Sequence, residues 1–94
     1  MATFMTRVEL HAADEDDYEA LHAAMEQEGF DRTITSGDGV TYHLPTAEYY
    51  RSAQLTQQQV LDSAKRAAAT TGKSYAVVVT ESNGVTWTGL TKVS

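Results

Sequence analysis

The hydrophobic periodicity of this chain predicts an α+β fold, a split βαβ sandwich of the ferredoxin-like type. Short runs alternate apolar and polar residues, and two longer stretches repeat apolar residues at helical spacing. Their order is strand, helix, strand, strand, helix, strand. In that fold both helices pack on one face of an antiparallel sheet. The 94 residues suffice for one such domain, 1–94, with an extra C-terminal strand.

The composition is that of an ordinary globular domain, with 41% hydrophobic and 21% charged residues. No basic segment is followed by an apolar run, and no apolar stretch approaches the ~20 residues that span a bilayer. We therefore expect a cytoplasmic protein without membrane association. The chain has no cysteine, and its histidines and carboxylates lack the spacing of metal ligands, so we expect neither a metal nor another cofactor.

Charge is distributed unevenly along the chain. The net charge of −6 disfavours indiscriminate binding to phosphates. Eight of the thirteen acidic residues lie between Asp14 and Asp31, a stretch without Lys or Arg, whereas Lys65, Arg66 and Lys73 cluster near the end of the second predicted helix. A molecule with this polarity can still bind one nucleic-acid segment locally.

The first strand and helix are predicted from residues 4–29. Residues 4–11 alternate with period two, and the next helix begins after Asp14, a favourable N-cap residue followed by three acids. Gly29 fits the left-handed position that ends a helix. The even-numbered apolar residues of the strand should face the helices.

A hairpin is predicted next. Strands at 30–35 and 40–44 flank the turn Ser36-Gly37-Asp38-Gly39, whose Asp-Gly pair tolerates the positive φ angles of hairpin turns. Pro45 should end the second of these strands, because it has no N–H to donate. Residues 46–53 have no firm assignment, and Tyr49 and Tyr50 could cover one end of the core.

The second helix should begin at Thr56, with Gln59 completing a capping box. A β-branched strand at 74–80 follows, and Asn83-Gly84 predicts a hairpin to the extra strand at 85–89. The residues expected to be buried are Val8, Leu21, Met25, Phe30, Ile34, Leu44, Val60, Leu61 and Ala64.

A polar cluster is predicted on the open face of the sheet. If the even-numbered residues of strand one face the helices, Arg7, Glu9 and His11 face outward, and parity places His43 on the same side. Strands one and three are neighbours in a split βαβ sheet, so these groups could supply a cation, a base and an imidazole. Ordinary cross-strand pairs on a solvated or dimer-facing surface are the alternative.

His22 stands apart from that cluster, at the edge of the apolar stripe of the first helix. The ordinary interpretation is a boundary residue with its tip in water. The sequence contains no G-x-S-x-G elbow and no H-E-x-x-H pair, and its Gly37–Gly39 turn lacks the Lys of a phosphate loop.

Ten positions of the first two thirds of the chain form one recognisable pattern: Val8, Tyr18, Leu21, Met25, Phe30, Ile34, Gly39, Leu44, Leu55 and Val60. With them, residues 4–68 resemble the GhoS-like family, the small endoribonuclease antitoxins of type V toxin–antitoxin systems. The resemblance implies a ferredoxin-like fold and selective cleavage of a toxin messenger RNA. Where the family has a functional Arg after the helix-one Leu, this chain has His22.

The expected function is therefore metal-independent RNA cleavage by a homodimer. Its chemistry would be attack of a 2′-hydroxyl on the adjacent phosphate, with His43 or His22 as base or acid and Arg7 as the cation. Trp87 and neighbouring strands should cover the open face in the dimer. The alternative is a non-enzymatic module that binds a protein partner through its open sheet face or an edge strand.

Overall fold

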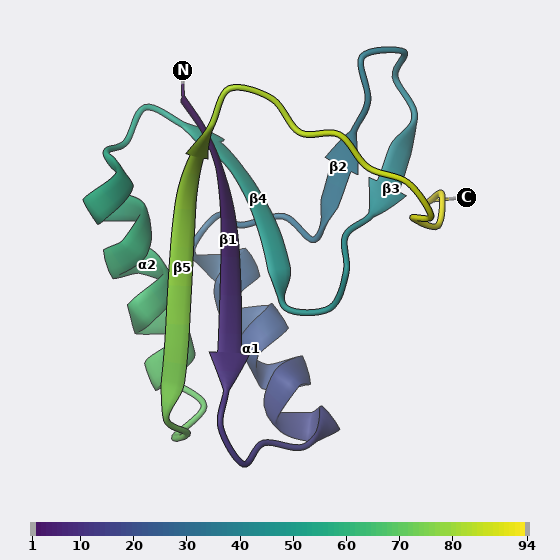
Figure 1. Cartoon of the computed structure of the whole chain (residues 1–94). Helices are drawn as coiled ribbons and strands as arrows, with labels where there is room; N and C mark the ends of the chain where they lie inside the picture. The colour runs from purple at the N-terminus through teal and green to yellow at the C-terminus, as the bar shows by residue number, and fades with distance from the viewer. Residues whose placement is uncertain (1, 94) are drawn as a thin grey trace.

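A computed structural model describes residues 2–93, so the two end residues of the predicted 1–94 domain lie outside that range. The elements in chain order are β1 (Ala2–Leu10), α1 (Glu15–Gln27), β2 (Thr33–Thr35), β3 (Thr41–His43), β4 (Glu48–Ala53), α2 (Gln57–Ala69) and β5 (Tyr75–Ser82). Figure 1 shows a two-layer body, with the hairpin of β2 and β3 standing beside it.

The main sheet has the order β4-β1-β5, and both neighbours run antiparallel to β1. Both helices lie behind this sheet, on the same face (Figure 1). This confirms the predicted fold class, an α+β arrangement compatible with a ferredoxin-like split βαβ sandwich.

Helix α1 begins and ends as its sequence predicts. The side chain of Asp14 accepts a hydrogen bond from the Asp17 N–H at 3.0 Å, and the Asp17 carboxylate accepts one from the Asp14 N–H at 3.0 Å. Gly29 has φ +96°, and the N–H of Phe30 returns to the Met25 carbonyl at 3.0 Å, a Schellman end. Local chemistry thus defines the whole helix.

The core lies between the sheet and the helices. Eight of the nine residues expected to be buried are buried, and Leu61 is half-buried. α2 contributes mostly small side chains, Ala64, Ala67 and Ala68, which let it approach the sheet closely. The even-numbered residues of β1 face this core as predicted, since Phe4 and Val8 are almost completely buried.

The identity of the strand beside β1 differs from the prediction. β4, in the stretch left without an assignment, pairs with β1, whereas the predicted strand 40–44 lies in a separate two-stranded sheet with β2. Tyr49 explains the choice: it is fully buried opposite Thr6, so it fills the core position that the neighbouring strand must supply. Within residues 2–93, the backbone pairing that links the start of the hairpin to the main sheet is the Asp31–Tyr50 bridge.

The predicted extra strand at 85–89 is wrong. Residues after β5 do not fold back on it at Asn83-Gly84 but cross to the hairpin, where the His43 N–H donates to the Thr91 carbonyl at 2.9 Å. Trp87 packs edge-on against Tyr42, with ring centroids 5.4 Å apart. Trp87 therefore packs on the hairpin, and it lines a hollow together with Thr3 and Tyr50 at the end of the open face.

Among residues 2–93 no helix combines the length and the apolar character needed to cross a membrane.

Candidate functional site

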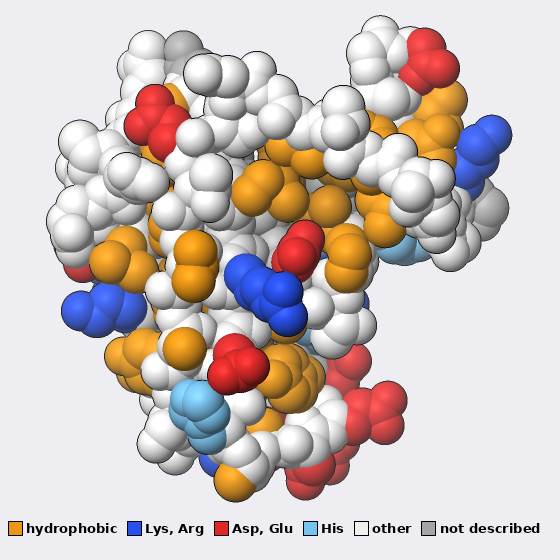
Figure 2. All heavy atoms as spheres, viewed as in Figure 1, with side chains coloured by type: hydrophobic (Ala, Val, Ile, Leu, Met, Phe, Trp, Pro, Cys, Tyr) orange, Lys and Arg blue, Asp and Glu red, His pale blue; other side chains and the backbone are white. Residues whose placement is uncertain are grey.

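The open face of the main sheet carries the most concentrated polar chemistry of the molecule. On β1, Arg7 and Glu9 point away from the helices and are exposed, and His11 follows directly after the strand. Figure 2 views this face: a blue side chain lies near its centre, with red ones on both sides and a pale blue one toward the end of β1. The predicted alternation along β1 is thus confirmed.

The cross-strand register surrounds Arg7 with two different neighbours. Glu48 on β4 and Val78 on β5 are its direct partners in the ladder. Glu9 is two residues further along β1. The distance between its carboxylate oxygen and the Nδ1 of His11 is 3.8 Å. The face thus presents a guanidinium, an imidazole and two carboxylates, all accessible to a ligand.

An apolar hollow adjoins these charges. Met5, Val78 and Val85 line it together with Arg7 and Glu48, and its volume is about 410 Å³. Val78 is 63% exposed, the highest value among the large apolar side chains of the described chain. A ligand on this face would therefore meet an apolar surface and a charged one side by side.

Tyr50 adds an aromatic ring to the same face. It lies opposite Met5 in the β1–β4 register and is half-buried. Sequence reasoning missed Glu48 and Tyr50 as site residues because it left β4 without an assignment. The adjacent tyrosines at 49 and 50, a residue type favoured in strands, were the available signal.

His43 does not belong to this cluster, which corrects the prediction. It lies on β3, opposite Thr33 in the hairpin sheet, and its side chain is exposed there. The parity argument failed because it assumed that residues 40–44 pair with β1. His43 and Arg7 are therefore in different sheets.

His22 is also placed differently from its prediction as a residue with its tip in water. It is only 5% exposed, and its Nδ1 lies 2.6 Å from the hydroxyl of Tyr49. Burial lowers the pKa of His22, with a smaller contribution from Arg32, and burial raises the pKa of Tyr49. The ring is thus neutral and the hydroxyl protonated, so we assign Tyr49 as the donor to Nδ1.

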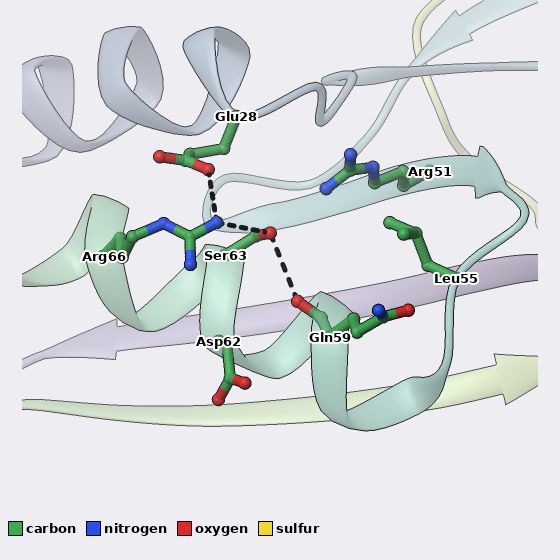
Figure 3. A pocket seen from close by; sticks show the side chains of 7 residues that line it. All are labelled: Glu28, Arg51, Leu55, Gln59, Asp62, Ser63 and Arg66. Atoms are coloured by element: carbon green, nitrogen blue, oxygen red, sulfur yellow. Dashed lines mark hydrogen bonds and ion pairs between the residues drawn. The ribbon is translucent and has the colours of Figure 1, made fainter.

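A second hollow of about 410 Å³ lies between the C-terminal end of α1, α2 and β4 (Figure 3). One of its arginines, Arg66, is hydrogen-bonded, whereas Arg51 keeps a buried nitrogen, Nη1, without a hydrogen-bond partner among residues 2–93. The Arg66 Nη2 donates to Glu28 and to Ser63, at 3.0 and 3.1 Å. Arg51 lies with its guanidinium carbon 5.2 Å from the centre of the Phe30 ring. With Glu28 and Asp62 in its walls, this hollow is a poor receptor for an anion.

The cluster of Lys65, Arg66 and Lys73, which could still bind one nucleic-acid segment, is partly neutralised by acids at both ends of α1. Besides the Arg66–Glu28 pair, Lys73 Nζ lies 3.7 Å from a carboxylate oxygen of Asp17. Two of the three predicted cations therefore face acids of the same chain. The open sheet face, not this cluster, is the better candidate for an RNA contact.

No protein-family model matches this chain, and no curated protein matches it.

Proposed function

We propose that this protein is a metal-independent, GhoS-like antitoxin-type endoribonuclease that binds RNA on the open face of its main sheet. One observation carries the proposal: Arg7, Glu9 and His11 lie on that face in one line, beside the aromatic ring of Tyr50. A sheet face that carries aromatic residues is a common platform for single-stranded RNA, and the half-buried Tyr50 supplies one here.

The line of side chains suits cleavage by the RNA's own 2′-hydroxyl. That reaction needs a group that removes the hydroxyl proton, an acid for the leaving oxygen and a cation near the phosphate. His11 can take the proton from the 2′-hydroxyl and return it to the leaving 5′-oxygen, Glu9 is close enough to orient its imidazole, and Arg7 can stabilise the phosphate charge. His11 thus takes the role that the sequence suggested for His43 or His22.

The geometry constrains how RNA would lie. Arg7 and His11 are four residues apart on an extended chain, which separates their Cα atoms by about 13 Å. For both side chains to act on one linkage, the scissile phosphate would have to lie between them along β1. Tyr50, on the neighbouring strand, is available to stack on a base.

The test is single-turnover cleavage of a mixed transcript pool in EDTA, comparing wild type with Arg7→Gln and His11→Gln. We expect each variant to slow cleavage by about 10²-fold or more, the usual share of a proton-transfer or charge-stabilising group. His43→Gln is the matched control, because it removes an equally exposed imidazole from the other sheet.

The pH dependence adds a second readout. A histidine that exchanges protons gives a limb in the pH–rate profile, and His11→Gln should remove that limb while His43→Gln keeps it. Loss of all activity in EDTA, or equal rates in wild type and both site variants, would contradict the mechanism.

A second candidate function is a module that binds a protein partner without catalysis. The apolar hollow beside Arg7 and the net charge of −6 favour it. No cleavage of a broad RNA pool by the folded wild-type protein would favour this candidate over the nuclease.

A further inference from the structure

The outer edge of β5 is open. β5 is the last strand of the β4-β1-β5 sheet, and within residues 2–93 no strand pairs with its far side (Figure 1). The His11 N–H donates to the Ser74 carbonyl, which sets the hydrogen-bond pattern between β1 and β5. Along β5, the backbone groups of even-numbered residues therefore bond to β1, and those of odd-numbered residues point outward. Gln57 fits this parity, since its Nε2 donates to the outward carbonyl of Val79 at 3.1 Å.

This edge lacks the features by which edge strands usually avoid pairing. Charged side chains, proline and bulges are the common ones. The segment Tyr75–Thr80 contains none of these, and four of its six residues are β-branched. Glu81 is the first charge along the strand. The edge is therefore a template for another extended chain.

Apolar surface flanks the edge on both faces of the sheet. On the open face, Val78 is 63% exposed. On the helix face, a groove of about 430 Å³ runs beside α2, where Leu61, Val77 and Val79 supply its apolar lining. A strand added to β5 would place alternate side chains over Val78 and into this groove.

We propose that the occupant is β5 of a second copy of this chain, paired antiparallel about a two-fold axis at Val78. In this register Val77 lies opposite Val79 of the second copy, and Tyr75 lies opposite its Glu81. All four residues turn their backbone groups outward, as hydrogen-bonded pairs require. The exposed Gln57 amide would have to release the Val79 carbonyl, so that the Val77 N–H of the second copy takes its place. The two copies of Val78 meet side by side on the open face.

Charge favours a second copy as the occupant. A strand without charges from residue 75 to residue 80 can lie against itself without opposing like charges. The acidic α1 lies away from this edge, with α2 nearer to β5 (Figure 1). The repulsion expected between two molecules of charge −6 is therefore weakest at this edge.

The proposed pairing of β5 strands gives a dimer and no larger assembly. The opposite edge of the main sheet is partly covered, because Tyr50 of β4 pairs with Asp31. A two-fold contact uses the same edge of both molecules, so it gives a dimer with one sheet of the order β4-β1-β5-β5-β1-β4 and leaves no second β5 edge for growth. This dimer does not depend on the proposed RNA cleavage.

The experiment is sedimentation equilibrium of wild type, Val78→Lys and Val78→Glu at micromolar concentrations. We expect wild type to dimerise, and each variant alone to weaken the dimer on the order of tenfold or more, because like charges meet at the axis. An equimolar mixture of the two variants should recover the dimer, since Lys then meets Glu. Val93→Lys, at a 41% exposed valine of the C-terminal segment, is the control and should dimerise like wild type.

Amide hydrogen exchange of the wild type distinguishes edge pairing from a dimer through the open face. The outward amides of Tyr75, Val77, Val79 and Glu81 should exchange more slowly as the dimer fills. A wild type that stays monomeric at high micromolar concentration overturns the proposal. So does a dimer whose outward amides exchange at the monomer rate, or a mixture that stays monomeric.

Discussion

At the scale of single residues, His22 shows how burial changes the chemistry of a side chain. Its ring lies in the interior against Tyr49, where the neutral form is favoured and no RNA phosphate can reach it. The resemblance to the GhoS-like family draws attention to this position, but its contacts here are those of a packing residue. The exposed His11, beside Glu9, is accessible for the proton transfer that we propose.

Burial of His22 predicts a pH-dependent stability. Burial lowers its pKa in the folded state, whereas the unfolded chain takes up the proton near the ordinary value of about 6.5. Below that pH the unfolded state binds the extra proton and gains stability, so the free energy of unfolding should fall as the pH drops from 7 to 5. His22→Gln should reduce this fall, as measured by urea denaturation at each pH.

The matched control for this prediction is His43→Gln, which removes an exposed histidine of the hairpin. Identical pH slopes in wild type and His22→Gln would show that the folded protein does not resist protonation of His22.

At the scale of elements, the hairpin of β2 and β3 stands beside the main sheet and is held there by few contacts. It is attached to the main sheet by the bridge of Asp31 and Tyr50, and its outer side is covered by the C-terminal segment. The edge-on contact of Trp87 with Tyr42 holds that segment in place. The last residues of the chain therefore stabilise the hairpin rather than extending the main sheet.

Trp87→Ala should loosen the hairpin without unfolding the domain. The aromatic pair contributes about 0.5–1.5 kcal/mol beyond its buried area, so exchange of the His43 and Val93 amides should quicken on the order of tenfold. The His11 amide, bonded to Ser74 in the main sheet, serves as the internal reference. Trp87→Phe should retain most of the protection, and equal exchange in all three proteins would refute the anchoring role.

At the scale of the whole molecule, one core joins both helices to the sheet. Phe4 and Val8 of β1, Leu21 and Met25 of α1 and Val60 of α2 belong to a single buried cluster. The opposite face of the sheet holds charges and half-exposed apolar residues. The buried core therefore lies on one face of the sheet, and the proposed binding surface lies on the other.

This division predicts different costs for the same substitution on the two faces. Met25 is completely buried, so Met25→Ala should lower the free energy of unfolding by about 2–5 kcal/mol. Met5 lies on the open face and is only half-buried, so Met5→Ala should cost clearly less. Urea denaturation measures both, and equal costs would mean that the open face is packed as the core is.

The sequence by itself determined the two helices, the strands β1 and β5, the hairpin turn and almost the whole core list. Each depends on neighbours close in the chain. Asp14 and Thr56 cap their helices, Gly29 ends α1, and the alternation along β1 already separates the buried residues from Arg7 and Glu9.

Only the tertiary structure decided which strand lies beside β1, and with it the composition of the site. Pairing between distant strands depends on which side chain fills the shared core, and Tyr49 does so better than any residue of 40–44. That choice brings Glu48 and Tyr50 to the open face, moves His43 to another sheet and buries His22 against Tyr49. These contacts join residues far apart in the chain, and local periodicity carries no information about them.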